Sequence, residues 1–287
     1  MKQLTIISGK GGTGKTTLTA AFAALTDNAV LADCDVDAAD LHLILKPKIK
    51  ETYDFIGLKL ALKDEALCTQ CGECKTHCRF DAVDDELNIV EDRCEGCGVC
   101  EYVCPVDAIH LIDRVSGYAY LSDTRFGPMS HAVLNTAEEG SGKLVAMVRN
   151  YARLLAKRYN KELIIIDGPP GIGCPVISAI SGVDMVLIVT EPTISGIHDL
   201  QRILDVTQHF GIKALVCINK FDINEENAGS IETYCLKRGI EVAGRIPYND
   251  ITTKAMIREM SVIEFSDGVF SENIRGIWDV INKAIML

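Results

Sequence analysis

The residues with the most evident chemistry in this chain of 287 lie in the stretch Gly9–Thr17, with the sequence GKGGTGKTT. An apolar run precedes this stretch and an alanine- and leucine-rich run follows it, so we expect a strand, a tight turn and a helix. Glycines in such a turn let backbone N–H groups converge on a phosphate, and the helix directs the positive end of its dipole there. The spacing predicts a nucleotide site formed by Gly9, Lys10, Gly11, Gly12, Thr13, Gly14, Lys15, Thr16 and Thr17.

Side chains in this loop and after two later apolar runs supply the charges that phosphate chemistry needs. Lys15 is expected to reach the β- and γ-phosphates, and the hydroxyl of Thr16 is placed for Mg²⁺. Asp167 closes a continuous apolar run, where a carboxylate is expected to hold Mg²⁺ through water. Asp33 and Asp35 follow another such run and would face the ligand crevice of a parallel sheet. Carboxylates at that edge can hold Mg²⁺ through water or orient an attacking water.

Eight of the twelve cysteines form two runs of the same spacing, C-x₂-C-x₂-C-x₃-C, at Cys68–Cys78 and Cys94–Cys104. The runs are offset by 26 residues throughout, which indicates an internal duplication of the two-cluster bacterial ferredoxin kind. Zinc is the alternative, because two short-spaced cysteines also suit that ion. In a ferredoxin repeat the fourth cysteine of each run binds the other cluster. The expected [4Fe–4S] ligands are Cys68, Cys71, Cys74 and Cys104 for one cluster, and Cys94, Cys97, Cys100 and Cys78 for the other.

Apolar runs alternate with helical patterns outside the cysteine-rich part. This alternation predicts an α/β fold with a mostly parallel, doubly wound sheet. A polar, glycine-dotted stretch, Arg125–Gly142, leads into a predicted helix from Lys143 to Arg158. A further amphipathic helix is predicted at Gly276–Met286, and its few basic residues favour core packing over membrane binding. The predicted strands are Leu4–Ser8, Ala29–Asp33, Leu163–Ile166, Met185–Thr190 and Ala214–Ile218.

The cysteine runs interrupt this α/β pattern. We expect a nucleotide-binding domain made of residues 1–62 and 113–287, and an inserted ferredoxin-like α+β domain of residues 63–112. An insert of about 50 residues can bury only a small apolar core. The clusters are therefore expected to replace much of that core, so that cluster loss unfolds the insert.

Charge and composition narrow the classes of partner. The net charge is −11, and residues 63–112 carry 12 acidic against 4 basic residues, a net of −8. Nucleic acid is an unlikely partner for such a chain, since its phosphates require lysine and arginine. No apolar run reaches the roughly 18 residues of a membrane span, and the first strand begins at once. Membrane binding is therefore not expected, and twelve cysteines without an export signal predict a reducing, cytoplasmic location.

Together KGGTGKT, DCDVD, the double cysteine run and DGPPG resemble the MinD/ParA/Mrp group of P-loop ATPases with a deviant Walker A motif, here containing an inserted ferredoxin domain. The resemblance implies that Lys10 reaches the nucleotide of a two-fold partner and that Asp35 positions the attacking water. It also implies that Asn219 contacts the adenine edge, and that the loop containing Pro247 covers the base. The implied ligands are ATP or ADP with Mg²⁺.

Two classes of function fit this resemblance. In the first, an ATP-driven homodimer couples slow hydrolysis to electron transfer, through two [4Fe–4S] clusters, to a redox partner. In the alternative, the protein is a nucleotide-switched scaffold or assembly factor, for metallocofactor maturation or MinD-like positioning, and its clusters are structural or redox-sensing. The residues do not identify the partner in either case.

Overall fold

The computed structural model of the protein describes residues 1–135 and 142–286. These residues form two compact units. The first unit contains the described residues of 1–52, 119–133 and 140–287, and the second those of 53–118 and 134–139. The loop Gly9–Thr17 lies in the first unit, and both cysteine runs lie in the second.

A nine-stranded sheet runs through the described residues in the order β3-β4-β5-β2-β6-β1-β7-β8-β9. The strands from β5 to β9 in this order pair in parallel, which confirms the predicted mostly parallel α/β sheet. The strands are β1 (Lys2–Ser8), β2 (Ala29–Asp33), β3 (Lys48–Lys63), β4 (Ile109–Thr124), β5 (Gly127–Leu134), β6 (Leu163–Pro170), β7 (Met185–Thr190), β8 (Lys213–Asn219) and β9 (Glu241–Ile246).

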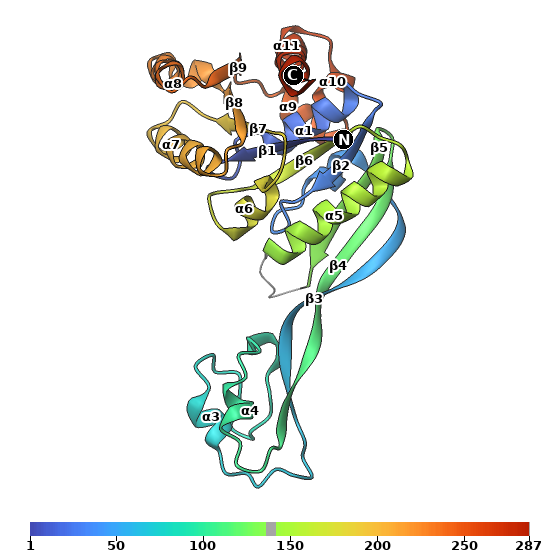
Figure 1. Ribbon diagram of the computed structural model, residues 1–287, viewed down its shortest axis with the longest axis vertical. Coiled ribbons are helices and arrows are strands. Elements are labelled where there is room, and N and C mark those ends of the chain that lie inside the picture. Colours follow the sequence, from blue (N-terminus) through green and yellow to red (C-terminus); the bar gives the residue numbers. More distant parts are fainter. Residues whose placement is uncertain (136–141, 287) are drawn as a thin grey trace. The chain divides into compact units, whose positions relative to one another are not determined.

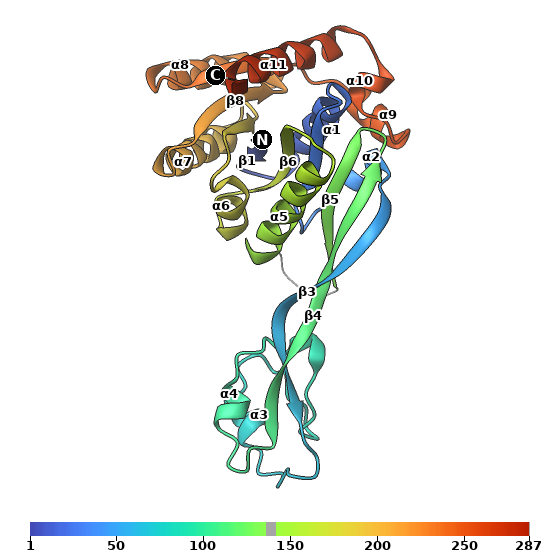
Figure 2. The ribbon, with the colours of Figure 1, turned by 45° about the vertical axis from the view of Figure 1, so that its right-hand side comes forward.

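Helices of the first unit cover both faces of its strands. The connection from β1 to β2 runs one way along the sheet, whereas the later connections from β5 to β9 run the other way. Because parallel crossovers are right-handed, α1 lies on one face and α5 to α8 lie on the opposite face (Figures 1 and 2). The helices are α1 (Lys15–Ala24), α2 (Leu41–Leu45), α5 (Gly142–Arg158), α6 (Cys174–Ile180), α7 (Ile194–His209), α8 (Glu225–Lys237), α9 (Ile251–Ile257), α10 (Val262–Phe265) and α11 (Val269–Met286).

The connections between strands change direction along the sheet at β1, and this change determines where the nucleotide loop lies. Ligands of open α/β sheets bind beyond the carboxyl ends of the strands, at the point where the strand order reverses. The loop Gly9–Thr17 leaves the carboxyl end of β1 and continues into α1. The topology therefore brings this loop to the expected ligand crevice.

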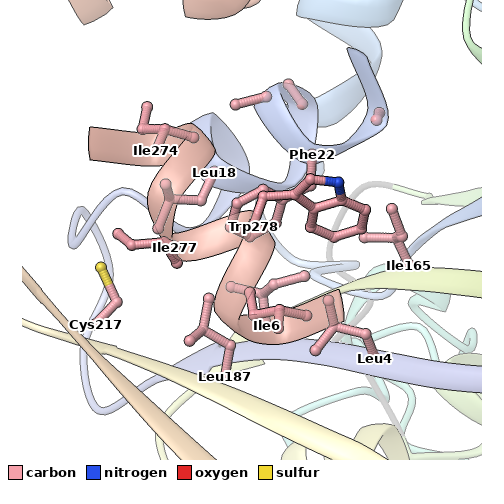
Figure 3. Close-up of a cluster of buried hydrophobic side chains, with 14 of the residues drawn as sticks. Leu4, Ile6, Leu18, Phe22, Ile165, Leu187, Cys217, Ile274, Ile277 and Trp278 are labelled. Carbon is pink, nitrogen blue, oxygen red and sulfur yellow. The ribbon is translucent and has the colours of Figure 1, made fainter. Parts of the chain in front are cut away.

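Helix α11 contributes its apolar side to the core that it shares with α1. Ile274, Ile277 and Ile281 are at most 1% exposed. Trp278 stacks on Phe22 with 5.0 Å between the ring centroids, as Figure 3 shows. The predicted core packing of this helix is thus confirmed. In the part of the chain that the structure describes, no helix is long and apolar enough to cross a membrane.

One stretch differs from the sequence-based expectation. Residues Gly127–Leu134, within the stretch predicted to be polar and glycine-dotted, form β5 and pair with β2 through Leu31 and Met129. Met129 and Ala132 are fully buried, so their burial outweighs the polar composition of the surrounding residues. Residues 136–141 of that stretch lie outside the described residues.

The second unit has little regular structure and a small core. It contains part of β3 and of β4, the short helices α3 (Glu73–His77) and α4 (Val99–Tyr102), and a 3₁₀ turn at Glu91–Arg93. Its core comprises Leu60, Ala61, Cys74, Ala82, Val83, Cys94 and Ile109. Two of these seven buried residues are cysteines of the repeated runs.

We expect Ile281→Ala to lower the free energy of unfolding by about 2–5 kcal/mol, because it leaves a cavity between α11 and the sheet. Ile257→Ala, at a side chain that is 77% exposed, is the matched control and should change it by less than about 0.5 kcal/mol. Urea unfolding followed by circular dichroism measures both. Equal, small effects would contradict the core role of α11.

Candidate functional site

The phosphate loop takes its shape from two glycines in left-handed conformations. Gly12 has φ of 77° and Gly14 has φ of 98°. Gly14 is the N-cap of α1, and its carbonyl accepts the N–H of Leu18 at 3.1 Å. Lys15 is the first residue of the helix and only 5% exposed. The glycines thus place the lysine at the helix N-terminus, where an anion is stabilised.

Side chains from the end of β8 hold this loop in place. Asn219 donates through Nδ2 to the carbonyl of Thr13 at 2.7 Å, and Lys220 donates through Nζ to the carbonyl of Gly12 at 3.3 Å. A Cβ atom on Gly14 would lie 2.5 Å from Nδ2 of Asn219. One donor of the Asn219 amide therefore supports the loop, and its predicted contact with adenine stays a prediction.

Asp35 lies beside the loop lysine, as the predicted phosphate chemistry requires. Nζ of Lys15 is 3.5 Å from Oδ2 of Asp35, and both side chains are less than 10% exposed. Burial raises the pKa of Asp35, and the nearby Lys15 opposes that rise. Asp33 accepts the backbone N–H groups of Asp35 and Leu41, each at 3.3 Å, so its carboxylate shapes the turn. Burial, followed by the charges of Asp167 and Asp35, raises the pKa of Asp33 well above its usual value.

Asp167 offers a fully buried carboxylate oxygen toward the same site. Its Oδ1 accepts the Thr19 hydroxyl at 3.3 Å, whereas Oδ2 has no hydrogen-bond partner among the described residues. Burial raises the pKa of Asp167 to about 7, against the lowering effect of the Thr16 hydroxyl and Lys15. An unpartnered buried oxygen beside a threonine hydroxyl fits Mg²⁺, which prefers oxygen ligands and retains several waters. The predicted residues Thr16 and Asp167 thus lie together with the donor chemistry that Mg²⁺ requires.

Lys10 forms an ion pair within its own chain that the sequence did not predict. Its Nζ lies 3.0 Å from Oε2 of Glu191, and Nζ of Lys220 lies 2.5 Å from Oε1 of the same carboxylate. The Glu191 side chain is only 10% exposed, and the two lysines lower its pKa in opposition to the effect of burial. Glu191 directly follows β7, so the strand-end argument that singled out Asp33 also applied to it.

A cavity adjoins the loop on the side where the base is expected. It is lined by Asn219 and Pro247, both predicted, and by Lys220, Tyr248, Phe270 and Ile274, which were not. Asp222 accepts the backbone N–H of Tyr248 at 2.7 Å and so fixes the loop that contains Pro247. Phe270 and Ile274 come from the first part of α11, which begins at Val269 and so precedes the predicted start of this helix at Gly276.

Each predicted set of four cysteines lines one cavity of the second unit. Cys78, Cys94, Cys97 and Cys100 line the first of these cavities. Cys68, Cys71, Cys74 and Cys104 line the other. Among the described residues, no three histidine, cysteine or acidic side chains converge as ligands of one ion. Ligands of an iron–sulfur cube each bind a different iron, so such ligands surround a volume and need not converge.

The backbone around the two cavities repeats with the sequence. Gly72 and Gly98 have φ of 80° and 79°, and each is the N-cap of a short helix that contains the third cysteine of its run. The fourth cysteines accept equivalent backbone N–H groups, from Ala82 to Cys78 at 3.4 Å and from Ala108 to Cys104 at 3.2 Å. Four thiols around an apolar cavity, with N–H donors to sulfur, fit the donor chemistry of a [4Fe–4S] cluster.

Comparisons with known proteins agree with the nucleotide site. A model of the CobQ/CobB/MinD/ParA nucleotide binding domain matches residues 4–262. An uncharacterized protein of Methanocaldococcus jannaschii is 36% identical over 287 residues, covering 99% of this chain and 97% of that one. MinD of Pyrococcus horikoshii OT3, solved with Mg-ADP, matches with a TM-score of 0.61 and 17% identity, covering 98% and 96% of the two chains. The MinC:MinD complex of Aquifex aeolicus matches with a TM-score of 0.59 and 19% identity, covering 99% and 96%.

We expect Gly14→Ala to lower the free energy of unfolding by at least about 1–2 kcal/mol, since alanine is strained at this φ and its methyl group meets Asn219. Gly11→Ala is the matched control, because a Cβ there meets no atom within 4 Å. Urea unfolding of the nucleotide-free protein measures both variants. A Gly14→Ala protein as stable as Gly11→Ala would show that the loop is not held by β8.

Proposed function

This chain belongs to the CobQ/CobB/MinD/ParA family of nucleotide-binding domains, and from that premise we propose that it is an ATP-hydrolysing switch that assembles with a protein partner in one nucleotide state. The observation that carries the proposal is the buried pair of Lys15 and Asp35 at the carboxyl edge of the sheet. MinD/ParA-type ATPases share this fold, and the Pyrococcus horikoshii protein was solved with Mg-ADP. Hydrolysis by this chain is expected to be slow.

In the proposed reaction the chain positions the phosphates and the attacking water. Lys15 binds the β- and γ-phosphates, and the N–H groups of the loop receive the remaining phosphate charge. Thr16 and Asp167 would hold Mg²⁺, which neutralises charge that develops on the phosphate oxygens. Asp35 lies next to Lys15 and orients the water for attack on the γ-phosphate. Asn219 and Pro247 contact the base on the side of the cavity.

Lys10 is proposed to act across a two-fold homodimer. In the free chain its ammonium is paired with Glu191, on a side chain that is still 36% exposed. A cation supplied in trans is a common way to meet transition-state charge in phosphoryl transfer. In a two-fold interface each Lys10 exchanges Glu191 for the phosphates of the partner's nucleotide, so ATP becomes part of the contact. A complex of this kind presents a different surface to a third protein than the separate chains do.

The family comparison indicates which kind of partner to expect, namely another protein. A MinD of Aquifex aeolicus is known in complex with MinC, a cell division protein. We infer that this chain likewise uses its ATP-bound state to hold a protein, as a scaffold or assembly factor.

We expect the Asp35→Ala protein to bind ATP without turnover and to dimerise with ATP but not with ADP. Adding Lys10→Ala should raise the dimer dissociation constant at least about tenfold, roughly 1.4 kcal/mol, while ATP binding persists. Sedimentation velocity measures the mass, and calorimetry measures nucleotide binding. Lys15→Ala serves as the control that loses ATP binding itself.

Two results would contradict this switch. A dimer of equal strength with ADP, with ATP and without nucleotide would remove the basis for nucleotide control. A Lys10→Ala protein that dimerises normally would show that Lys10 is a loop lysine paired with Glu191 and nothing more.

We further propose that the two cysteine cavities hold one [4Fe–4S] cluster each, with crossed ligation. What supports this is the composition of the cavities, each lined by three cysteines of one run and the fourth of the other. Bound clusters would supply one-electron redox chemistry and fill the small core of the second unit. ATP-coupled electron transfer to a redox partner is therefore the second candidate function. A partner that is reduced only with hydrolysable ATP would favour it over the assembly factor, which should bind its partner regardless of cluster oxidation.

We expect roughly eight irons per anaerobically purified chain, from two four-iron clusters. Cys78→Ser should leave roughly four, and adding Cys94→Ser should remove no more, since both residues are assigned to one cluster. Adding Cys68→Ser to Cys78→Ser should remove the rest. Elemental analysis with visible absorption measures this, and Cys174→Ser, outside both runs, is the control. Stoichiometric zinc without visible absorption would contradict the cluster proposal.

A further inference from the structure

The two cysteine cavities are built from equivalent positions of the internal repeat. Residues 26 positions apart in the sequence line the two cavities in the same roles. The cysteines obey this offset, and so do the apolar lining residues, for example Ala61 and Leu87, Phe80 and Val106, and Val83 and Ile109. The second unit therefore contains two copies of one site, and differences between them can be identified position by position.

One position of this repeat differs in charge near the cavity wall. Ile89 lines the cavity of Cys94, Cys97 and Cys100, whereas Lys63 occupies the equivalent position in the other cavity. Nζ of Lys63 donates to the carbonyl of Leu87 at 2.8 Å. Only 8% of the Lys63 side chain is exposed. A lysine side chain with little exposed surface thus adjoins one cavity, and an apolar side chain takes its place at the other.

The glutamates at the cavities do not cancel this difference. Glu73 lines the cavity of Lys63 and Glu95 lines the cavity of Ile89, so each cavity has one glutamate. Glu65 pairs with Lys63 at 2.9 Å, but 71% of its side chain is exposed and water screens its charge. The Lys63 side chain is 8% exposed, so its charge is screened less than that of Glu65. Of the two cavities, the one of Cys68, Cys71, Cys74 and Cys104 therefore has the more positive lining.

We propose that Lys63 raises the reduction potential of the cluster held by Cys68, Cys71, Cys74 and Cys104 above that of the other cluster, so that the first electron entering the protein resides there. The inference rests on the proposed clusters. Reduction adds one negative charge to a cluster that four thiolates already make negative, and a cation in the cavity wall stabilises the added charge. An external one-electron donor supplies the electron, no bond is broken, and Lys63 keeps its proton throughout.

The test is a redox titration of the anaerobic full-length protein with dithionite, followed by electron paramagnetic resonance. We expect two reduction steps with different midpoint potentials. Lys63→Met should lower the higher of these two potentials. The expected change is at least about tenfold in the equilibrium constant for reduction, or about 59 mV for a one-electron step. Lys75→Met is the control, because it removes the same charge from a lysine whose side chain is 38% exposed. It should leave both midpoint potentials unchanged. Lys63→Arg keeps the charge and should keep the higher potential.

A second variant tests the same idea with the opposite sign and leaves Lys63 intact. Glu65→Gln removes the carboxylate that pairs with Lys63, so the higher midpoint potential should rise. Because water screens this carboxylate, the rise should be smaller than the fall in Lys63→Met. Unchanged midpoints in both Lys63→Met and Glu65→Gln, or a shift of the lower step alone, would overturn the assignment of Lys63. Absence of iron from the unsubstituted chain would overturn the clusters themselves, which is a separate outcome.

Discussion

Three aspartates and one lysine are buried together at the carboxyl edge of the sheet, and this imbalance of charge governs the site. Asp33, Asp35 and Asp167 are at most 6% exposed, and Lys15 is the lysine buried with them. A buried carboxylate without a partner is costly, which is why burial raises the pKa of all three aspartates. Asp33 offsets part of that cost with two backbone N–H groups, but one oxygen of Asp167 has no donor. A divalent cation would supply the missing positive charge, and for the same reason phosphate binding is expected to require Mg²⁺.

The second unit has an analogous deficit, in packing rather than in charge. Its buried core consists of seven residues, and its helices are only four and five residues long. So small a core contributes little stability of its own, and a metal group bound by the unit would add its binding free energy to folding. The structure contains no disulfide among the described cysteines, and eight of these line two cavities. In both units, therefore, the proposed ligand would complete what the chain alone leaves unsatisfied.

The parts of both sites that were predictable from the sequence are those set by local spacing. The loop glycines, Lys15 and Asp167 follow from a short motif and from the ends of apolar runs, and the crossed cysteine sets follow from a repeat. The contacts that depend on how distant elements meet were not predictable in this way. Phe270 lines the cavity beside the phosphate loop because α11 packs next to that cavity. Glu191 meets Lys10 because β7 adjoins β1. The strand β5 was missed because Met129 is buried by neighbours that lie far away in the sequence.

The ion pair of Lys10 shows why a weak contact suits a switch. The Lys10 side chain is 36% exposed, so water can solvate its ammonium when it leaves Glu191, which keeps the cost of leaving low. Glu191 would not then be left as an unpaired buried charge, because Lys220 remains 2.5 Å from it and also holds the carbonyl of Gly12. The phosphate loop would accordingly keep its support if Lys10 changed partner. A single carboxylate shared by two lysines thus lets one of them move without loosening the nucleotide site, which is the property that a nucleotide-controlled dimer requires.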